Sequence, residues 1–176
     1  MGSGYLTYHG VKKDYSAFKA IVDDSLTEVT AEMLDGVTNI GEGAFSGCRA
    51  LTSVIIPSSV TSINENAFSY CRALTSVTIP SSVTSIGKSA FSDCSALTSI
   101  TIPSGVTYIG NYTFYYCSAL TSVTVEMITP PPIGVELFTG THADLVIYVP
   151  AGSVEAYKAA NRWSTYANRI QAIPST

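Results

Sequence analysis

Charged residues are scarce in this chain of 176 residues. Only 12% of the residues are charged, the nine lysines and arginines are scattered, and the net charge is −4. Proteins that bind nucleic acid cluster basic side chains to neutralise phosphates. The sequence therefore argues against nucleic acid as a partner.

Long apolar runs are also missing, although 46% of the residues are hydrophobic. No stretch approaches the roughly 20 apolar residues that a helix needs to cross a bilayer, so we expect no membrane insertion. The chain begins Met-Gly-Ser-Gly, and no apolar secretion segment follows. Because an expression tag begins in the same way, this start says little about the native compartment.

Groups that carry out chemistry are rare. Both histidines, His9 and His142, lie outside the repeated part of the chain. His142 stands two residues before Asp144, but without a nucleophile this pattern favours a turn ahead of a strand over acid–base chemistry. We find no Gly-rich phosphate loop and no Ser-His-Asp arrangement. We therefore expect neither an enzyme nor a cofactor.

The strongest positive feature is a repeat with a constant period of 23 (71−48, 94−71 and 117−94). Three residue types recur at this interval: Cys48, Cys71, Cys94 and Cys117; Phe45, Phe68, Phe91 and Phe114; Leu51, Leu74, Leu97 and Leu120. A fixed period in this range is typical of stacked repeats that share one continuous core. We predict a β-rich repeat solenoid.

Each repeat predicts one strand and a path that returns to the next strand. In the copy over 83–105, Ile100, Thr101 and Ile102 alternate as a half-buried strand does, and Pro103 ends it. Neighbouring strands lie about 5 Å apart. We therefore expect like residues to stack on one another, phenylalanine on phenylalanine and cysteine on cysteine.

The cysteine column admits three interpretations. Stacking at about 5 Å lies within the distance that a disulfide tolerates, but parallel side chains would have to distort to form one. No histidine accompanies a cysteine, and no close cysteine pair has zinc-site spacing. Buried free thiols are the favoured interpretation, and disulfides and a metal column are the alternatives.

We divide the chain into three segments of a single structural domain. Residues 1–36 form an N-terminal segment and cap, with a short helix from Asp14 to Asp23 and a degenerate first strand from Leu26. Residues 37–128 hold four repeats, at 37–59, 60–82, 83–105 and 106–128. Residues 129–176 form a C-terminal cap.

The C-terminal cap is expected to contain a strand and a short helix. After a stiff link of three prolines, residues 145–149 form a last strand that Pro150 ends. Ser153 is the expected N-cap of a helix that turns Tyr157 inward. Trp163 and Tyr166 are expected to cover the open end of the stack.

The repeated string Leu-Thr-Ser-Val-Thr-Ile-Pro-Ser-Ser-Val-Thr-Ser-Ile, followed by Ala-Phe-x-x-Cys, resembles the BspA-like, or treponemal-type, leucine-rich repeats of bacterial surface proteins. The ending Ile-Tyr-Val-Pro-Ala-Gly-Ser-Val-Glu-Ala-Tyr-Lys is similar to a C-terminal cap often attached to such arrays. The resemblance covers roughly residues 26–173. It implies an α/β-type leucine-rich repeat fold, an extracellular or cell-surface location, and adhesion to host proteins and cells, without catalytic residues.

The copies differ most on either side of the repeated phenylalanine. Solenoids concentrate variation in loops, which often form the binding face. Four tyrosines crowd the fourth repeat, and a fifth lies further along the same edge: Tyr108, Tyr112, Tyr115, Tyr116 and Tyr70. Exposed tyrosines are effective contact residues, so this edge is the first candidate contact surface. The alternative is that these side chains pack against the C-terminal cap.

A row of threonines beside the strands is the second candidate surface: Thr52, Thr75, Thr98 and Thr121. Regular rows of hydroxyl groups suggest ice binding. Threonine is also common on exposed strands because its branched side chain fits the pleated surface of a strand, and we favour this structural interpretation.

The sequence thus predicts a non-catalytic module for protein or cell-surface recognition. The expected partner is a protein or a cell-surface glycoconjugate. The alternative is a passive structural spacer, or a coat or tail component of a surface or phage-like assembly, which near-identical repeats favour. A virion-associated or cytoplasmic location and the oligomeric state stay open.

Overall fold

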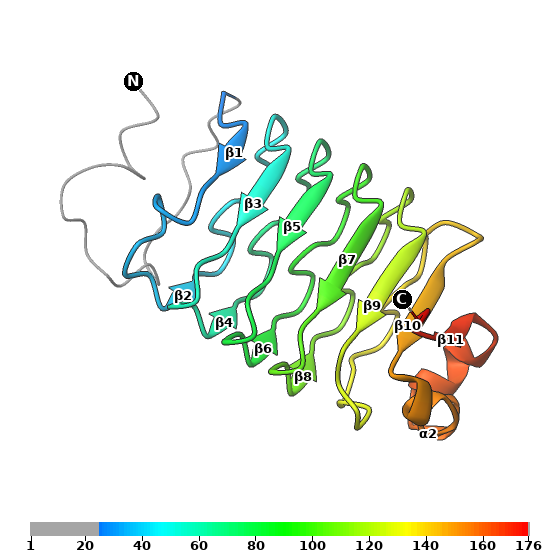
Figure 1. The fold of residues 1–176 in the computed structure, drawn as a ribbon. Helices are drawn as coiled ribbons and strands as arrows, with labels where there is room; N and C mark the ends of the chain where they lie inside the picture. The colour runs from blue at the N-terminus through cyan, green and yellow to red at the C-terminus, as the bar shows by residue number, and fades with distance from the viewer. Residues whose placement is uncertain (1–24, 176) are drawn as a thin grey trace.

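The computed structural model describes residues 25–175, and the helix expected between Asp14 and Asp23 lies outside this range (Figure 1). Within it, the chain winds into a row of coils, each of which adds one strand to each of two sides of the stack. The predicted β-rich repeat solenoid is confirmed.

One side of the stack is built from the longer strands. In spatial order these are β1 (Glu28–Val29), β3 (Ser53–Ile55), β5 (Ser76–Thr78), β7 (Ser99–Ile102), β9 (Ser122–Val125), β10 (Val146–Val149) and β11 (Ile170–Ala172). All pairings are parallel, and hydrogen bonds join them as two sheets, β1-β3-β5 and β7-β9-β10-β11. Figure 1 shows the two sheets following one another along the stack, with β5 beside β7. We call this side the main face.

A third parallel sheet runs along another side of the stack. Its strands are β2 (Asn39–Ile40), β4 (Ser62–Ile63), β6 (Ser85–Ile86) and β8 (Tyr108–Ile109). Ser62 pairs with Ser85, and Ser85 pairs with Tyr108, so the register advances by one full repeat at each step. A bridge between Ile109 and Ile133 carries the pattern one coil further.

The strands form where the sequence alternates. In β7, Ile100 and Ile102 are buried and Ser99 and Thr101 are exposed, as the alternation predicts. Pro103 follows the strand directly and ends it, because proline cannot donate to the ladder. The expected first strand near Leu26 is present as β1, which pairs with β3 through Val29 and Val54.

The core is a column of stacked aromatic rings. Five phenylalanines take part: Phe45, Phe68, Phe91, Phe114 and Phe138. Neighbouring ring centroids are 5.1, 5.3, 5.8 and 5.7 Å apart, and the planes are within 7° of parallel. The last ring meets Tyr166 edge-on at 5.2 Å and 79°, which ends the column.

The cysteines form a second buried column. The thiols of Cys71, Cys94 and Cys117 are free, and they donate to the carbonyls of Phe45, Phe68 and Phe91 in the preceding coil at 3.1, 3.2 and 3.1 Å. Buried thiols are therefore observed at these three positions. Each of these thiols also joins two coils by a hydrogen bond. The interpretation of the cysteines as small hydrophobic residues did not predict this bond.

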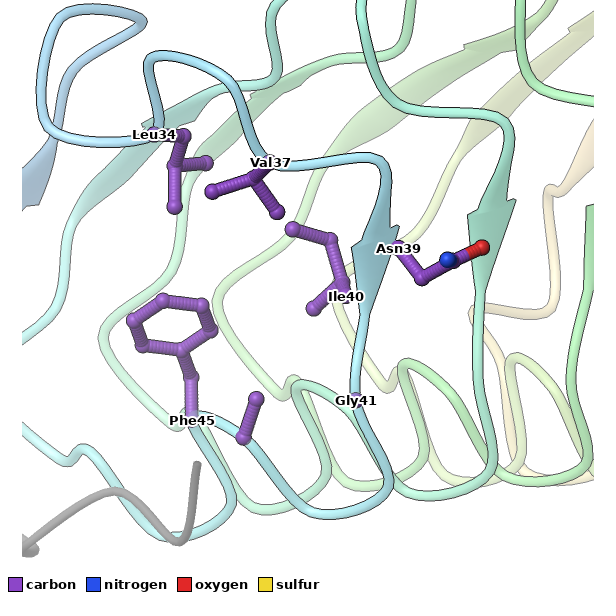
Figure 2. A pocket seen from close by; sticks show the side chains of 7 residues that line it. Leu34, Val37, Asn39, Ile40, Gly41 and Phe45 are labelled. Atoms are coloured by element: carbon purple, nitrogen blue, oxygen red, sulfur yellow. The ribbon is translucent and has the colours of Figure 1, made fainter. Parts of the chain in front are cut away.

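The first coil of the described range is tightly packed. Figure 2 shows Leu34, Val37, Ile40 and Phe45 around a gap that is lined by apolar surface. The gap measures about 10 Å³ and its apolar lining residues are almost fully buried. A space of this size holds at most one water molecule, so the gap between these described residues is too small for a ligand.

The stack continues past residue 128. The interval from Phe114 to Phe138 is one residue longer than the regular period, and the coil that contains Phe138 leads into β10. The strand predicted at 145–149 is thus observed, but it is not the last one. Ile170–Ala172 form β11, which pairs with β10 and takes the outer position. The division at residues 36 and 128 stays a proposal about sequence segments.

The cap after β10 comprises η2 (Ala151–Ser153), α2 (Val154–Ala159) and η3 (Trp163–Arg169). Ser153 occupies the predicted N-cap position of α2, but the side-chain capping bond expected there does not form. Ser153 is buried at the end of the 3₁₀ turn η2 and already has helical dihedral angles, φ −107° and ψ −5°, with no side-chain capping bond. A capping side chain normally requires an extended backbone at that residue.

Three side chains of the cap satisfy carbonyl groups of the last coil. The Tyr157 hydroxyl donates to Met127, the Trp163 indole to Pro131 and the Arg162 guanidinium to Ile133, each at 2.8 Å. An open edge of a sheet invites pairing with other chains. The cap thus blocks the end of the stack with side-chain donors, and the covering role predicted for Trp163 is observed.

We expect Tyr157→Phe to lower the free energy of unfolding by about 1–3 kcal/mol, because it leaves the buried Met127 carbonyl without its donor. Denaturant unfolding measures the change. Tyr148→Phe, on the outer side of β10, is the matched control, and we expect a change within about 0.5 kcal/mol. Equal effects in both variants would contradict the role assigned to Tyr157.

Candidate contact surfaces

Two positions with left-handed backbone recur in five turns, those that follow β2, β4, β6, β8 and the bridge residue Ile133. The first position is occupied by Gly43, Asn66, Ser89, Tyr112 and Glu136, and the second by Gly47, Tyr70, Asp93, Tyr116 and Gly140. Left-handed backbone suits glycine, asparagine and aspartate, and is rare for bulky residues. The variable positions of the sequence are therefore the positions of the turn that require this conformation.

Three tyrosines of the fourth repeat form one cluster in such a turn. Tyr112 meets Tyr115 edge-on at 5.5 Å, and Tyr115 meets Tyr116 edge-on at 4.5 Å. Tyr116 is 51% exposed, and the other two are half-buried. Desolvation, followed by the nearby Tyr116 and Glu136, raises the pKa of Tyr115. The cluster therefore presents a polar aromatic surface.

Tyr70 lies on the same edge, two coils away. It occupies the second left-handed position of its turn, as Tyr116 does, and Asp93 occupies that position between them. The backbone bonds from Tyr70 to Ser92 and from Asp93 to Tyr115 hold the three turns in register at 2.8 and 2.7 Å. We call Tyr70, Tyr112, Tyr115 and Tyr116 the tyrosine edge.

Tyr108 is placed apart from the tyrosine edge. It lies in β8, is 46% exposed, and lines a groove together with cap residues and the segment Pro130–Pro132. The structure therefore brings four of the five candidate tyrosines to one edge. The alternative, packing against the C-terminal cap, describes Tyr108 and also applies to Tyr116, whose ring lies against Gly140 of the segment 129–176.

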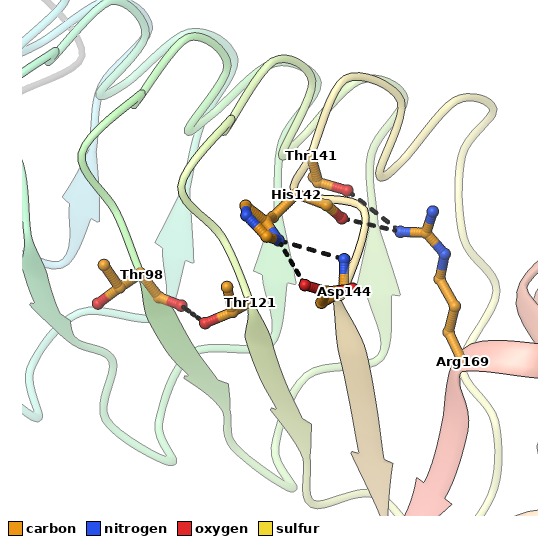
Figure 3. Close-up of polar contacts among 6 residues, drawn as sticks. All are labelled: Thr98, Thr121, Thr141, His142, Asp144 and Arg169. Carbon is orange, nitrogen blue, oxygen red and sulfur yellow. Dashed lines mark hydrogen bonds and ion pairs between the residues drawn. The ribbon is translucent and has the colours of Figure 1, made fainter.

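The threonine row lies just before the strands of the main face. The hydroxyls of Thr52, Thr75 and Thr121 donate to the carbonyls of Thr27, Thr52 and Thr98 at 2.9, 3.1 and 3.3 Å. Figure 3 shows the bond between Thr98 and Thr121. These exposed hydroxyls donate their hydrogens to the preceding coil, so their observed contacts are structural.

The pair His142 and Asp144 lies in the turn ahead of β10, as predicted. The backbone N–H of Asp144 donates to Nδ1 of His142 at 3.2 Å, and the carboxylate lies 3.7 Å from the same nitrogen. Figure 3 shows Arg169 reaching this turn, where it donates to Thr141 Oγ1 and the His142 carbonyl at 3.5 and 3.4 Å. The group fastens η3 to the last coil.

Two grooves at the junction of the stack and the cap were not predicted. One, of about 420 Å³, is lined by Tyr108, Pro130–Ile133 and Ala160–Trp163. The other, of about 510 Å³, shares these prolines and includes Glu126 and the exposed Ile128. The available signal was the proline run, which does not reveal that residues much later in the sequence face it.

Within residues 25–175, no group of three or more histidine, cysteine, aspartate or glutamate side chains is arranged to hold a metal ion. Among the helices of the same range, none is both long enough and apolar enough to span a bilayer.

Residues 14–143 match the family model for the BspA type leucine rich repeat region, in six copies. Comparison with curated proteins gives no match. Three solved bacterial structures are similar: a leucine-rich repeat protein from Bacteroides ovatus, the leucine-rich repeat protein of T. pallidum, and a leucine-rich cell surface protein from Faecalibacterium prausnitzii.

The similarity covers only part of each of these three proteins. For the B. ovatus protein the TM-score is 0.58 at 27% identity, over 68% of this chain and 30% of that one. For the T. pallidum protein the TM-score is 0.61 at 32% identity, over 66% of this chain and 54% of that one. For the F. prausnitzii protein the TM-score is 0.59 at 29% identity, over 80% of this chain and 34% of that one. The chain thus spans about a third to a half of these proteins. From the match over residues 14–143 and the stacked coils, the chain belongs to the BspA-type leucine-rich repeat family of bacterial surface proteins.

Proposed function

We propose that the chain is a non-catalytic recognition module that mediates adhesion to a protein or a cell surface through the tyrosine edge. The observation that carries the proposal is the placement of Tyr70, Tyr112 and Tyr116 at left-handed positions, with φ of 60°, 58° and 54°. Residues held in such conformations cost on the order of 1–3 kcal/mol each and cluster at functional sites.

The coil itself does not require tyrosine there. Glycine, asparagine, serine and aspartate occupy the same positions in neighbouring coils, and the backbone hydrogen bonds of the turn form in every case. A requirement other than folding is therefore the natural reason for the aromatic side chains. Tyrosine provides a large amphipathic contact area at low rotamer cost, which is why it dominates many binding surfaces.

The family supports this interpretation, since its members are bacterial surface proteins and leucine-rich repeats are generally non-catalytic repeats that bind proteins. The F. prausnitzii neighbour is described as a cell surface protein. On this basis we place the native protein outside the cell or at its surface. A passive spacer is the second candidate, favoured by the threonine row, whose hydroxyls bond from coil to coil.

A transplant between coils tests the tyrosine edge. Tyr112→Ser, Tyr115→Ser and Tyr116→Asp together give the fourth repeat the residues that the third has at the same positions, Ser89, Ser92 and Asp93. We expect binding to immobilised extracellular-matrix proteins or mucins to fall at least about tenfold, since contact tyrosines often contribute more than about 1 kcal/mol each. Surface plasmon resonance measures the affinity, and a melting curve confirms that the variant folds.

Tyr148→Thr is the matched control. Tyr148 pairs with Thr124 on the main face, so this variant also replaces an aromatic residue with its counterpart from the neighbouring coil. Loss of binding in the control alone would move the contact surface to the main face. Binding that survives both changes would contradict the proposal, and a wild-type chain that binds nothing would favour the spacer.

A further inference from the structure

We propose a second ligand site that is separate from the tyrosine edge: the groove of about 420 Å³ between β8 and the cap, which takes an anionic sugar residue. The ligand is a pyranose ring that carries a carboxylate, sulfate or phosphate, at an accessible end of a glycan. The volume lies within the range of small-molecule sites in proteins.

The walls of the groove suit a ring. Tyr108, 46% exposed, stands on β8, and the half-buried Pro130 and the exposed Pro132 line the same groove. Pro131, Ile133 and Trp163 also line it and are buried. Flat apolar surfaces of this kind contact the C–H faces of a sugar, while the hydroxyl of Tyr108 and the amide of Asn161 offer hydrogen bonds to its hydroxyls.

The positive charge of Arg162 in the groove favours an anionic ligand. Among the described residues that line it, the charged one is Arg162, and the ion pairs found within residues 25–175 do not involve it. One N–H of its guanidinium donates to the Ile133 carbonyl at 2.8 Å. A guanidinium has five such donors in a planar fork, so the group can hold an oxyanion while it keeps this bond.

The backbone of Arg162 is strained. Its φ is 65° and its ψ is −32°, outside the range preferred by residues with a long side chain. The neighbouring groove of about 510 Å³ has Glu126 as the charged residue in its described lining. That carboxylate repels an anion, so the charged end of the ligand belongs on the Arg162 side of the prolines.

An extended peptide fits the same groove poorly. A peptide that adds a strand needs free backbone donors and acceptors along the groove. Three successive prolines provide no N–H group. The carbonyls of Pro131, Pro132 and Ile133 already accept from Trp163, from the Ile109 N–H and from Arg162. Recognition must therefore come from side chains, which favours a ring over a strand.

Trp163 provides a direct test, because it is the single tryptophan of the chain and lines the groove. The probes are sialyllactose, digalacturonate and glucose 6-phosphate, each at up to about 10 mM, with lactose and glucose as neutral controls. We expect a saturable change in Trp163 emission with at least one anionic probe, and at least tenfold weaker binding of the neutral sugars. Saturation-transfer NMR follows the same titration without relying on fluorescence.

Arg162→Gln removes the charge and shortens the side chain by two atoms, so the hydrogen bond to the Ile133 carbonyl is lost as well. We expect it to weaken anionic-sugar binding at least tenfold, and a melting curve checks that the variant stays folded at the temperature of the titration. Arg169→Gln is the control, because Arg169 contacts the turn at Thr141 and His142, outside the groove.

The site is overturned by any of three results: neither readout detects an anionic sugar, Arg162→Gln binds as the wild type does, or a peptide binds where the sugars do not. None of these results depends on the tyrosine edge, so the two proposals fail separately.

Discussion

We expect Phe91→Ala to lower the free energy of unfolding by about 3–5 kcal/mol. Phe91 is fully buried, and its ring lies between Phe68 and Phe114 at centroid distances of 5.3 and 5.8 Å. Its own N–H donates to the Thr113 carbonyl at 3.0 Å, and the Phe68 N–H donates to the Ala90 carbonyl at 2.8 Å. Because these bonds fix the spacing of the coils, the stack cannot collapse into the space that the ring leaves.

Denaturant unfolding followed by circular dichroism measures this loss. Tyr108→Ala is the control, since it removes an aromatic side chain that is 46% exposed, and we expect it to cost less than about 1 kcal/mol. A loss below about 1 kcal/mol for Phe91→Ala would contradict the column. A reduced denaturant dependence would show instead that the two halves of the stack unfold separately, as repeat arrays can when an interface is weakened.

The interior of the repeats could be predicted because a fixed period places equal residues on top of one another. The buried positions of Phe91, Cys94 and Leu97 follow from this argument alone. The thiol bond from Cys94 to the Phe68 carbonyl does not follow from it. That bond depends on the path of the turn, which spacing does not describe.

The ends of the stack were harder to predict for a related reason. The coil around Phe138 departs from the regular period by one position and has Thr141 where the other coils have a cysteine, although Pro150 keeps the place of the strand-ending proline. Strand β11 is three residues long and follows a 3₁₀ helix, so it has too little alternation to be detected. It forms because β10 offers an edge for it to pair with.

The candidate contact surfaces likewise include one that the repeat pattern predicts and one that it does not. Tyr70 and Tyr116 could be assigned to one edge, because they occupy the same position in repeats two coils apart. Gly43 and Gly47 carry a signal for left-handed backbone in the first repeat, which in principle extends to the tyrosines. The groove at Arg162 carries no such signal, because it exists only where the cap meets residues far away in the sequence.

Alkaline pH should unfold the protein through the cysteine column. Desolvation, as the largest cause, raises the pKa of Cys71 and of Cys117 to about 12, and raises the pKa of Cys94 well above its ordinary value of 9.0. Between about pH 9 and 12 the unfolded chain has therefore lost thiol protons that the folded chain retains. The stabilisation from these raised pKa values is complete below about pH 9 and is lost as the pH rises through the folded values.

The expected slope is steep. Each such thiol lowers the free energy of unfolding by about 1.4 kcal/mol per pH unit, so the three together give about 4 kcal/mol per unit. Since ordinary domains are stable by about 5–15 kcal/mol, two to three pH units above 9 should suffice for unfolding. Denaturant unfolding at a series of pH values from about 7 to 11 measures the slope.

Cys94→Ser provides the control within the column. A serine hydroxyl retains a donor for the Phe68 carbonyl and does not titrate in this range, so the slope should fall by about a third while the protein stays folded at neutral pH. All other side chains are the same in the two proteins, so the difference between their slopes reports on Cys94. An unchanged slope in Cys94→Ser would show that some other group drives the alkaline transition. Labelling with a thiol reagent at pH 8 gives an independent check. A protonated, buried cysteine column should react only when the protein unfolds, whereas fast labelling of the folded protein would contradict it.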